Sequence, residues 1–216
     1  APLAELVPLA HRFGAIVLLD DAHGTGTLGA RGRGSAELGD VLAQVDVLVG
    51  TLGKSLGSFG AFVAGSFALR ELLVNTARSF IFSCALSPPQ VEAARAALRL
   101  VDREPWRREK LQQLAQRLRE ELAAEGISTA PSATHIVPVQ IGENAETMAL
   151  SEALLARGFY VQGIRHPSVP RGSARLRITP MAGHSEQDVG ALVACLLELL
   201  QPRRGNAVPR SELRAP

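Results

Sequence analysis

A chain of 216 residues, of which 46% are hydrophobic, is long enough to bury a core and to form one or two domains. Its net charge is only +2, its aromatic content is 4%, and no basic stretch is interleaved with aromatics, so nucleic-acid binding has little support. The longest apolar runs have the length of a strand, too short to cross a bilayer, and no signal-peptide pattern opens the chain. Cys84 and Cys195 show no metal-binding spacing, which fits a reducing cytoplasm and leaves a disulfide between them open.

The first strong pattern is the apolar run at residues 15–19, which is followed by Asp20 and Asp21. Five successive apolar residues, most of them branched, predict a strand of a parallel sheet that is buried on both faces. The carboxyl end of such a strand is where open α/β sheets place ligands. Either acid could pair with a protonated ring nitrogen or cap a turn, and His23 could reach the same ligand or be an ordinary loop histidine.

A second apolar run, residues 45–51, predicts a neighbouring strand, and Lys54 follows it in a glycine-rich turn. The chain holds only one other lysine, Lys110, among 23 Lys and Arg residues. An amine, unlike a guanidinium, can lose its proton and form an imine with a carbonyl or with pyridoxal phosphate. The alternative is a solvated surface lysine. The two strands together place the acid, the imidazole and the amine at one edge of one sheet.

The rest of the chain alternates helical and strand patterns, with a break near Pro105 that we take as a domain boundary. Ser185 is expected to cap the last helix, with Asp188 three residues on. The expected elements are strands at 60–65, 79–83, 134–141, 159–163 and 175–179, and helices at 67–77, 90–101, 107–124, 145–157 and 186–200. The polar, proline-bearing tail 201–216 is expected to be mobile.

Several of these segments together resemble the α-oxoamine synthases, fold-type I pyridoxal phosphate enzymes that condense an amino acid with an acyl thioester. The resemblance rests on residues 20–26, 32–35, 51–54, 81–83, 163–170 and 174–179, and extends to about Leu200. It implies an α/β fold in which residues 1–104 are the later part of the large cofactor-binding domain and residues 105–200 are a small C-terminal α/β domain. The chain is thus expected to be the C-terminal portion of a longer enzyme.

The resemblance also implies roles for residues of the cofactor site. Lys54 would form the imine with pyridoxal phosphate and later move the α-proton of the substrate, and Asp20 would pair with the pyridinium nitrogen. His23 would hydrogen-bond the phenolic oxygen of the ring, and Thr51 would bind the phosphate. Ser83 would lie near the cofactor phosphate of the partner subunit, with a plain strand-end hydroxyl as the alternative.

The expected substrate contacts lie nearer the C-terminus. A guanidinium can bind a carboxylate through two hydrogen bonds, and Arg177 is favoured as the clamp for the amino-acid carboxylate because its position matches that of the family's clamp. Arg165 is the second candidate, and a solvated charge at the end of a strand is the alternative for both. Ser168 matches a substrate-contacting position of the family. His166 stands where the family usually has a second proline, which puts the local shape of the pocket in doubt. Gly24, Gly26, Gly32 and Gly34 are interpreted as backbone devices for tight loops.

The resemblance implies a cytoplasmic acyltransferase that acts as a homodimer with its site at the interface, with no metal, nucleic-acid or membrane partner. Its substrates would be L-alanine and a pimeloyl thioester of CoA or an acyl carrier, as in the biotin-pathway branch of the family. The runner-up is glycine C-acetyltransferase or a broad-specificity synthase. A different class, a non-catalytic remnant or regulatory subunit, stays open. The 216 residues alone are expected to be inactive, because the upstream half of the family's large domain supplies the group that stacks on the ring.

Overall fold

The computed structural model describes residues 1–129 and 131–204, with side chains described up to residue 200. The chain divides into two compact units, Ala1–Glu109 and Lys110–Pro216. The sequence prediction had placed the boundary at residues 104 and 105, five residues before this division.

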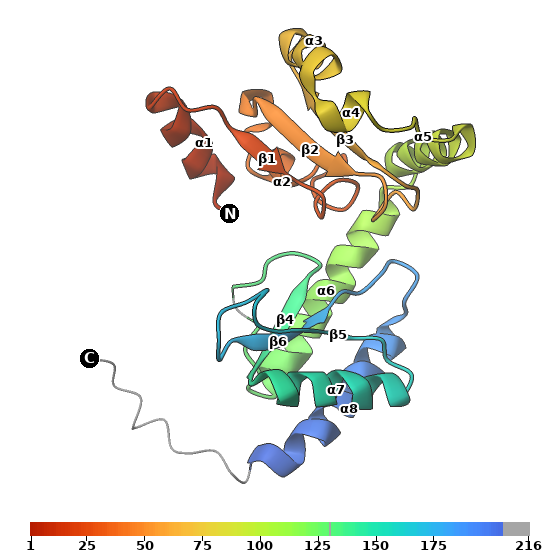
Figure 1. The fold of residues 1–216 in the computed structure, drawn as a ribbon. Helices are drawn as coiled ribbons and strands as arrows, with labels where there is room; N and C mark the ends of the chain where they lie inside the picture. Colours follow the sequence, from red (N-terminus) through yellow and green to blue (C-terminus); the bar gives the residue numbers. More distant parts are fainter. Residues whose placement is uncertain (130, 205–216) are drawn as a thin grey trace. The chain divides into compact units, whose positions relative to one another are not determined.

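The first unit is built on a three-stranded sheet of order β1-β2-β3, drawn in Figure 1. Its strands are β1 (Leu18–Asp20), β2 (Val47–Thr51) and β3 (Ala61–Gly65). β1 and β2 run parallel, with Asp20 opposite Val49, and β3 pairs with β2 in the antiparallel direction. The predicted neighbouring strands therefore pair as expected, and their carboxyl ends meet at one edge of the sheet.

Asp46 explains why one polar residue interrupts the second apolar run. Its Oδ2 accepts a hydrogen bond from the Val17 backbone N–H at 2.8 Å and lies 3.2 Å from Nε2 of His11. The Val17 hydrogen bond, followed by the one from His11, holds the pKa of Asp46 below its usual value. The carboxylate thereby ties the start of β2 to the segment that enters β1.

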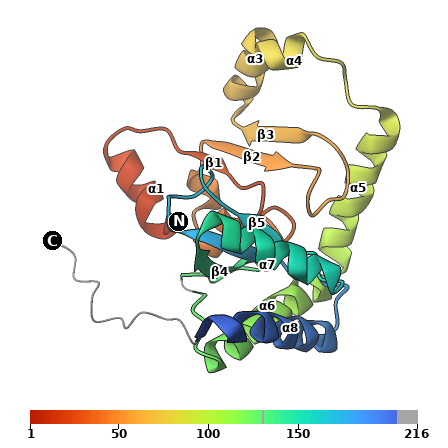
Figure 2. The same cartoon turned by 60° about the horizontal axis from the view of Figure 1, so that its bottom comes forward.

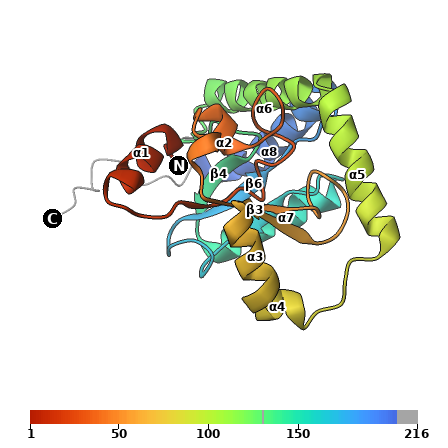
Figure 3. The same cartoon turned by 90° about the horizontal axis from the view of Figure 1, so that it is seen from above.

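Short helices complete the first unit. They are α1 (Leu3–Arg12), α2 (Ser35–Leu38), the 3-10 turn Leu42–Gln44, α3 (Phe67–Thr76), α4 (Arg78–Ile81) and α5 (Pro88–Arg103). Figure 3 shows α3 and α4 in succession, followed by an extended segment that leads to α5. The strand predicted at 79–83 is wrong, because α4 occupies most of that segment. The aromatic and branched residues Phe80, Ile81 and Phe82 favour a strand, but no strand of the described chain pairs with this segment.

The first unit buries little apolar surface. Its core cluster consists of Val7, Ala36 and Val41, with a few partly buried neighbours. The predicted burial of β1 on both faces is wrong for this chain, since Leu18 is 64% exposed and Ile16, just before the strand, is 77% exposed. No other element of the described chain covers these two side chains.

The second unit has a complete core around an antiparallel sheet of order β4-β6-β5. Its elements are α6 (Trp106–Ala124, which begins in the first unit), β4 (Val137–Gly142), α7 (Asn144–Ala156), β5 (Gln162–Ile164), β6 (Ala174–Ile178) and α8 (Glu186–Arg204). Burial alternates along β6, with Leu176 fully buried among leucines of α6, α7 and α8, including Leu118, Leu150 and Leu196. Figures 1 and 2 show α7 next to β5.

Two predictions about the C-terminus have different outcomes. The described helix α8 continues to Arg204, so the part of the predicted tail at 201–204 is helical rather than irregular. The prediction of a mobile tail over 205–216 lies outside the described residues. The two cysteines, Cys84 and Cys195, are both free, which answers the question of a disulfide between them.

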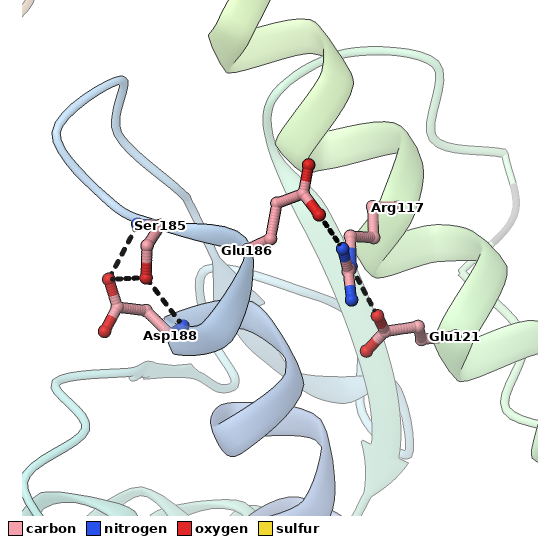
Figure 4. A network of polar contacts seen from close by, with 5 residues as sticks. All are labelled: Arg117, Glu121, Ser185, Glu186 and Asp188. Atoms are coloured by element: carbon pink, nitrogen blue, oxygen red, sulfur yellow. Dashed lines mark hydrogen bonds and ion pairs between the residues drawn. The ribbon is translucent and has the colours of Figure 1, made fainter.

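The start of α8 shows the predicted cap, which Figure 4 draws in detail. The backbone N–H of Asp188 donates to Ser185 Oγ at 3.1 Å, and Asp188 Oδ2 accepts from the Ser185 backbone N–H at 2.7 Å and from its hydroxyl at 2.8 Å. These bonds satisfy donors that the first turn of a helix leaves unpaired. Beside the cap, Arg117 of α6 forms ion pairs with Glu121 and with Glu186 of α8.

This cap predicts a pH-dependent contribution to stability. The backbone hydrogen bond from Ser185, followed by the one from its hydroxyl, holds the pKa of Asp188 below its usual value. A carboxylate with a lowered pKa stabilises the fold above the pKa of the unfolded chain and loses that contribution as the pH falls through the folded pKa. The unfolding midpoint in urea of Asp188→Asn should therefore lie below that of wild type at pH 6 and approach it at about pH 3.

The control for this comparison is Glu152→Gln, on the exposed face of α7. It removes a carboxylate of the same unit that takes part in no cap. The prediction would be contradicted if the unfolding midpoint of Asp188→Asn lay below that of wild type by the same amount at pH 6 and at pH 3.

Candidate active site

Three of the predicted site residues come together at one edge of the first sheet. Asp20 ends β1, Thr51 ends β2, and the parallel pairing brings these two strand ends side by side. Lys54 follows in a turn that is closed by a hydrogen bond of 3.0 Å from the Gly57 N–H to the Lys54 carbonyl. Asp20 and Lys54 are exposed, and Thr51 is half-buried. The sequence thus places a carboxylate, a hydroxyl and an amine at one accessible edge.

The structure separates the roles of the two adjacent acids. Successive residues of a strand point to opposite faces, and Asp20 is exposed while Asp21 is only 5% exposed. Asp20 Oδ1 accepts from the Ala22 backbone N–H at 3.0 Å. Asp21 accepts from the backbone N–H and the hydroxyl of Ser35, both at 2.7 Å. Asp21 is therefore a buried acid held by Ser35, whereas Asp20 caps the turn that follows β1 and is the acid that a ligand can reach.

His23 lies in the turn that follows β1, with an exposed ring. The turn is closed by hydrogen bonds of 3.0 Å from the backbone N–H groups of Gly24 and Thr25 to the Asp21 carbonyl. The Thr27 hydroxyl donates to the His23 carbonyl at 2.8 Å, which fixes the backbone of His23 from the other side. The imidazole is thus carried by a rigid turn on the same edge as Asp20.

The glycines of the following loop are confirmed as backbone devices. Gly26, Gly32 and Gly34 adopt φ of 80°, 71° and 93°, values that favour glycine. Gly24 and Gly34 also pack against the carboxylate of Asp21, where an added Cβ would lie 2.2 and 1.7 Å from its oxygens. The loop is therefore shaped around that carboxylate.

A contact that the sequence did not predict joins the two loops of the site. The Ser55 hydroxyl donates to the Thr25 carbonyl at 2.5 Å. It connects the turn of Lys54 to the turn of His23 across 30 positions of the sequence. No local sequence pattern predicts such a contact, because serine is common in turns and its presence beside a lysine indicates no distant partner.

The Thr51 hydroxyl is engaged within the protein. It donates to the Gly60 carbonyl at 3.2 Å and accepts from the Gly53 backbone N–H at 3.2 Å. A role in binding phosphate requires the hydroxyl to turn from the Gly60 carbonyl to a phosphate oxygen. The Gly53 N–H, which donates to the Thr51 hydroxyl here, would become a second donor at the same position if it turned to the phosphate as well.

Ser83 lies apart from this group in the sequence and follows α4. Its hydroxyl donates to the Ser79 carbonyl at 2.7 Å, as serine does at the end of a helix. Because 79–83 is not a strand, Ser83 is not a strand-end hydroxyl. Its predicted role near a partner's cofactor phosphate remains a prediction.

In the second unit, Arg165 and Ser168 line a cavity of about 440 Å³. The cavity lies along β5 and the facing side of α7, and its wall combines apolar and polar groups. Its lining residues are Met148, Ser151 and Leu155, together with residues 160–168. Arg165 and Ser168 belong to one turn, because the Ser168 backbone N–H donates to the Arg165 carbonyl at 2.9 Å. His166, which departs from the family pattern, is part of the same wall.

Arg177 lies on β6, opposite Gln162 of β5. Its Nη2 donates to Gln162 Oε1 at 3.0 Å, and its side chain is half-buried. The buried residues of β6 alternate with Arg177, so Arg177 belongs to the face of the sheet away from the helical core. The hydrogen bond to Gln162 fixes part of the guanidinium and leaves further N–H groups for a carboxylate.

Within residues 1–129 and 131–204, no group of three or more His, Cys, Asp and Glu residues is arranged to hold a metal ion. No helix in this part of the chain is long and apolar enough to span a membrane.

The chain belongs to the aminotransferase class I and II family, whose model matches residues 1–196. Relatives named 8-amino-7-oxononanoate synthase are similar to most of the chain. The relative from Geobacter sulfurreducens is 50% identical over 201 residues, which cover 92% of this chain and 51% of the relative. The relative from Nitrosococcus oceani is 49% identical over 93% of this chain and 53% of its own length. The chain thus spans about half the length of the curated relatives it matches.

Solved structures agree with the α/β, fold-type I architecture. The serine palmitoyltransferase of Sphingomonas wittichii superposes with a TM-score of 0.88 at 32% identity, over 97% of this chain and 52% of that one. An 8-amino-7-oxononanoate synthase from Francisella tularensis, at 24% identity, has a TM-score of 0.79 over 92% of this chain and 59% of its own, and shows the fold alone. These comparisons confirm the resemblance to α-oxoamine synthases.

Proposed function

We propose that this chain forms part of a pyridoxal phosphate-dependent acyltransferase that condenses L-alanine with a pimeloyl thioester. The products would be 8-amino-7-oxononanoate, carbon dioxide and the free thiol. The observation that carries the proposal is the edge of the first sheet, where Asp20 ends β1 and Lys54 follows β2, the strand that pairs with β1 in parallel. Names of relatives at about 50% identity support the choice of reaction.

The residues at this edge fit pyridoxal phosphate by their chemistry. The cofactor presents an aldehyde, a ring nitrogen, a phenolic oxygen and a phosphate, and the edge offers an amine, a carboxylate, an imidazole and a hydroxyl from Lys54, Asp20, His23 and Thr51. The carboxylate of Asp20 is exposed and accepts one backbone hydrogen bond, from the Ala22 N–H, so it has acceptor capacity for a ring N–H. A solved serine palmitoyltransferase chain that is 32% identical to this one carries pyridoxal phosphate.

When bound, pyridoxal phosphate supplies an electron sink for the bonds at the substrate α-carbon. The chain's own part is to hold it and to move protons. Lys54 Nζ would attach it covalently and then carry the proton of the substrate α-carbon. Asp20 would hold a proton on the ring nitrogen by charge, and His23 would donate to or accept from the phenolic oxygen. Thr51, with the Gly53 N–H, would bind the phosphate.

The second unit would supply the substrate contacts. Arg177 is oriented by its hydrogen bond to Gln162 and would bind the amino-acid carboxylate through the N–H groups of its guanidinium that do not donate to Gln162. Arg165 and Ser168 would contact substrate from the wall of their cavity. As parts of the same proposal, residues 1–104 belong to the cofactor domain, residues 105–200 form the small domain, and the enzyme is a cytoplasmic homodimer whose site lies at the interface.

The proposal is tested with the complete protein, assayed with alanine and glycine against pimeloyl and acetyl thioesters, by measuring release of the thiol. Alanine with the pimeloyl thioester should exceed every other pair by at least about tenfold in kcat/KM. A preference for glycine with the acetyl thioester would instead support the runner-up, glycine C-acetyltransferase. No turnover of any pair would support a non-catalytic subunit. The 216-residue chain, assayed beside it, is expected to be inactive.

A further inference from the structure

Asp21 is a buried acid to which the proposed function assigns no role. Only 5% of its surface is exposed, and a buried carboxylate costs free energy unless hydrogen bonds compensate it. Ser35 provides that compensation, since its backbone N–H donates to Oδ2 and its hydroxyl to Oδ1, both at 2.7 Å. The chain therefore maintains this carboxylate at a position one residue from Asp20 and two from His23.

The main chain of Asp21 connects the strands to the turn of His23. Its N–H donates to the Val49 carbonyl of β2 at 2.8 Å, so β1 and β2 stay paired up to this residue. Its carbonyl accepts from the N–H of Gly24, the N–H of Thr25 and the Thr25 hydroxyl, each at 3.0 Å. A change in the orientation of Asp21 would therefore displace the turn that carries His23.

The same residue is linked to the turn of Lys54 through Thr25. Thr25 is bound to the Asp21 carbonyl by both its N–H and its hydroxyl, and its own carbonyl accepts from Ser55 Oγ at 2.5 Å. Ser55 follows Lys54 directly in the sequence. A continuous series of hydrogen bonds thus runs from Ser35 through Asp21, Thr25 and Ser55 to the loop of the amine.

The space around the carboxylate fits aspartate closely. A Cβ at Gly24 would lie 2.2 Å from Oδ1 of Asp21, and a Cβ at Gly34 would lie 1.7 Å from Oδ2. Neither glycine could therefore carry a side chain without displacing the carboxylate of Asp21.

We propose that Asp21 and Ser35 form a positioning pair, which fixes the turn of His23 and, through Thr25 and Ser55, the loop of Lys54 in the geometry that the reaction needs. The inference rests on the proposed function, because the two loops matter only if they hold the cofactor. Asp21 touches neither cofactor nor substrate in this arrangement. A purely structural staple would lower stability alone, whereas a positioning pair also changes the environment of the bound cofactor.

The test compares variants of the complete protein loaded with pyridoxal phosphate. Ser35→Ala removes one hydrogen bond, and Asp21→Ala removes both. Asp21→Asn is the conservative variant, since its carbonyl can accept from the Ser35 N–H while its amide donates to the Ser35 hydroxyl. Ser185→Ala is the matched control, because Ser185 donates its N–H and hydroxyl to Asp188 in the cap of α8.

The measurements are the pH titration of the visible absorbance of the bound cofactor, kcat and KM, and the thermal unfolding midpoint. We expect kcat to fall about tenfold in Ser35→Ala and about a hundredfold in Asp21→Ala, with KM within about threefold, since small displacements of reacting groups have effects of this size. The absorbance titration should shift in both variants. Asp21→Asn should recover most of kcat, and Ser185→Ala should leave both kcat and the titration unchanged.

Some outcomes would overturn the inference. If Ser35→Ala and Asp21→Ala lose thermal stability as Ser185→Ala does, and keep the absorbance titration and kcat of wild type, the pair has a structural role only and the inference is overturned. If Asp21→Ala does not fold, the results for Ser35→Ala decide between the two roles. Failure of the proposed function is recognised separately and earlier, by wild-type protein that shows no visible absorbance with pyridoxal phosphate; that result would overturn both.

Discussion

Replacement of Lys54 by alanine in the complete protein is expected to lower turnover by about a thousandfold or more and to abolish covalent attachment of pyridoxal phosphate. The amine lies in the turn after β2, at the edge where β1 also ends, and is exposed to an incoming aldehyde. Lys54→Arg should be as inactive as Lys54→Ala, because a guanidinium keeps the positive charge and cannot deprotonate to attack a carbonyl. The measurements are kcat and borohydride reduction followed by peptide mapping.

Lys110 is the natural control for this prediction, as the only other lysine of the chain. It lies in α6, within the second unit. Lys110→Arg should keep activity near that of wild type, and reduction with borohydride should label the peptide of Lys54. A label found on Lys110 alone would show that the amine of the site has been misassigned.

The Asp20→Asn variant should lose about ten- to a thousandfold in turnover and keep most of its affinity for the cofactor. A carboxylate beside a protonated nitrogen raises the pKa of that nitrogen by one to about three units. A neutral amide does not raise it, so the ring nitrogen would lose its proton more readily in the variant. Affinity depends also on Lys54, Thr51 and His23, which the substitution leaves in place. The measurements are kcat and the dissociation constant of pyridoxal phosphate in the two proteins.

Asp46→Asn is a suitable control, because Asp46 is another carboxylate of the first unit that binds only backbone and His11. It should alter stability more than turnover. Equal losses of turnover and of cofactor affinity in Asp20→Asn would mean that Asp20 is a structural anchor and does not tune the ring.

The elements that the sequence predicted well are those encoded by neighbouring residues. The cap of α8 depends on Ser185 and Asp188, three positions apart, and the structure shows their hydrogen bonds. The break before α6 follows from Pro105. β2 follows from a run of branched apolar residues, and β3 follows from a short apolar run between Gly60 and Gly65. Each of these signals acts within one or two turns of chain, so the amino-acid order is sufficient to reveal them.

Predictions that depended on distant partners were less successful. The segment Ser79–Ser83 holds the aromatic and branched residues that are typical of a strand, yet a strand needs a neighbour to pair with, and the chain forms α4 over most of it. The apolar run before Asp20 predicted burial on both faces, but burial requires covering elements, and Leu18 is 64% exposed in the described chain. In both cases the local pattern was correct as a preference and the tertiary surroundings decided the outcome.

By itself, the sequence determined which residue types can carry the chemistry and at which edge they fall: an acid after one strand, an amine after the next, and an imidazole between them. The tertiary structure decided which of two adjacent acids faces solvent. Asp20 and Asp21 are equivalent in sequence, and only the contact with Ser35, 14 residues away, directs Asp21 inward and leaves Asp20 exposed. The physical reason is that a buried carboxylate must find its hydrogen-bond donors, and those donors come from a segment that only the folded loop brings near.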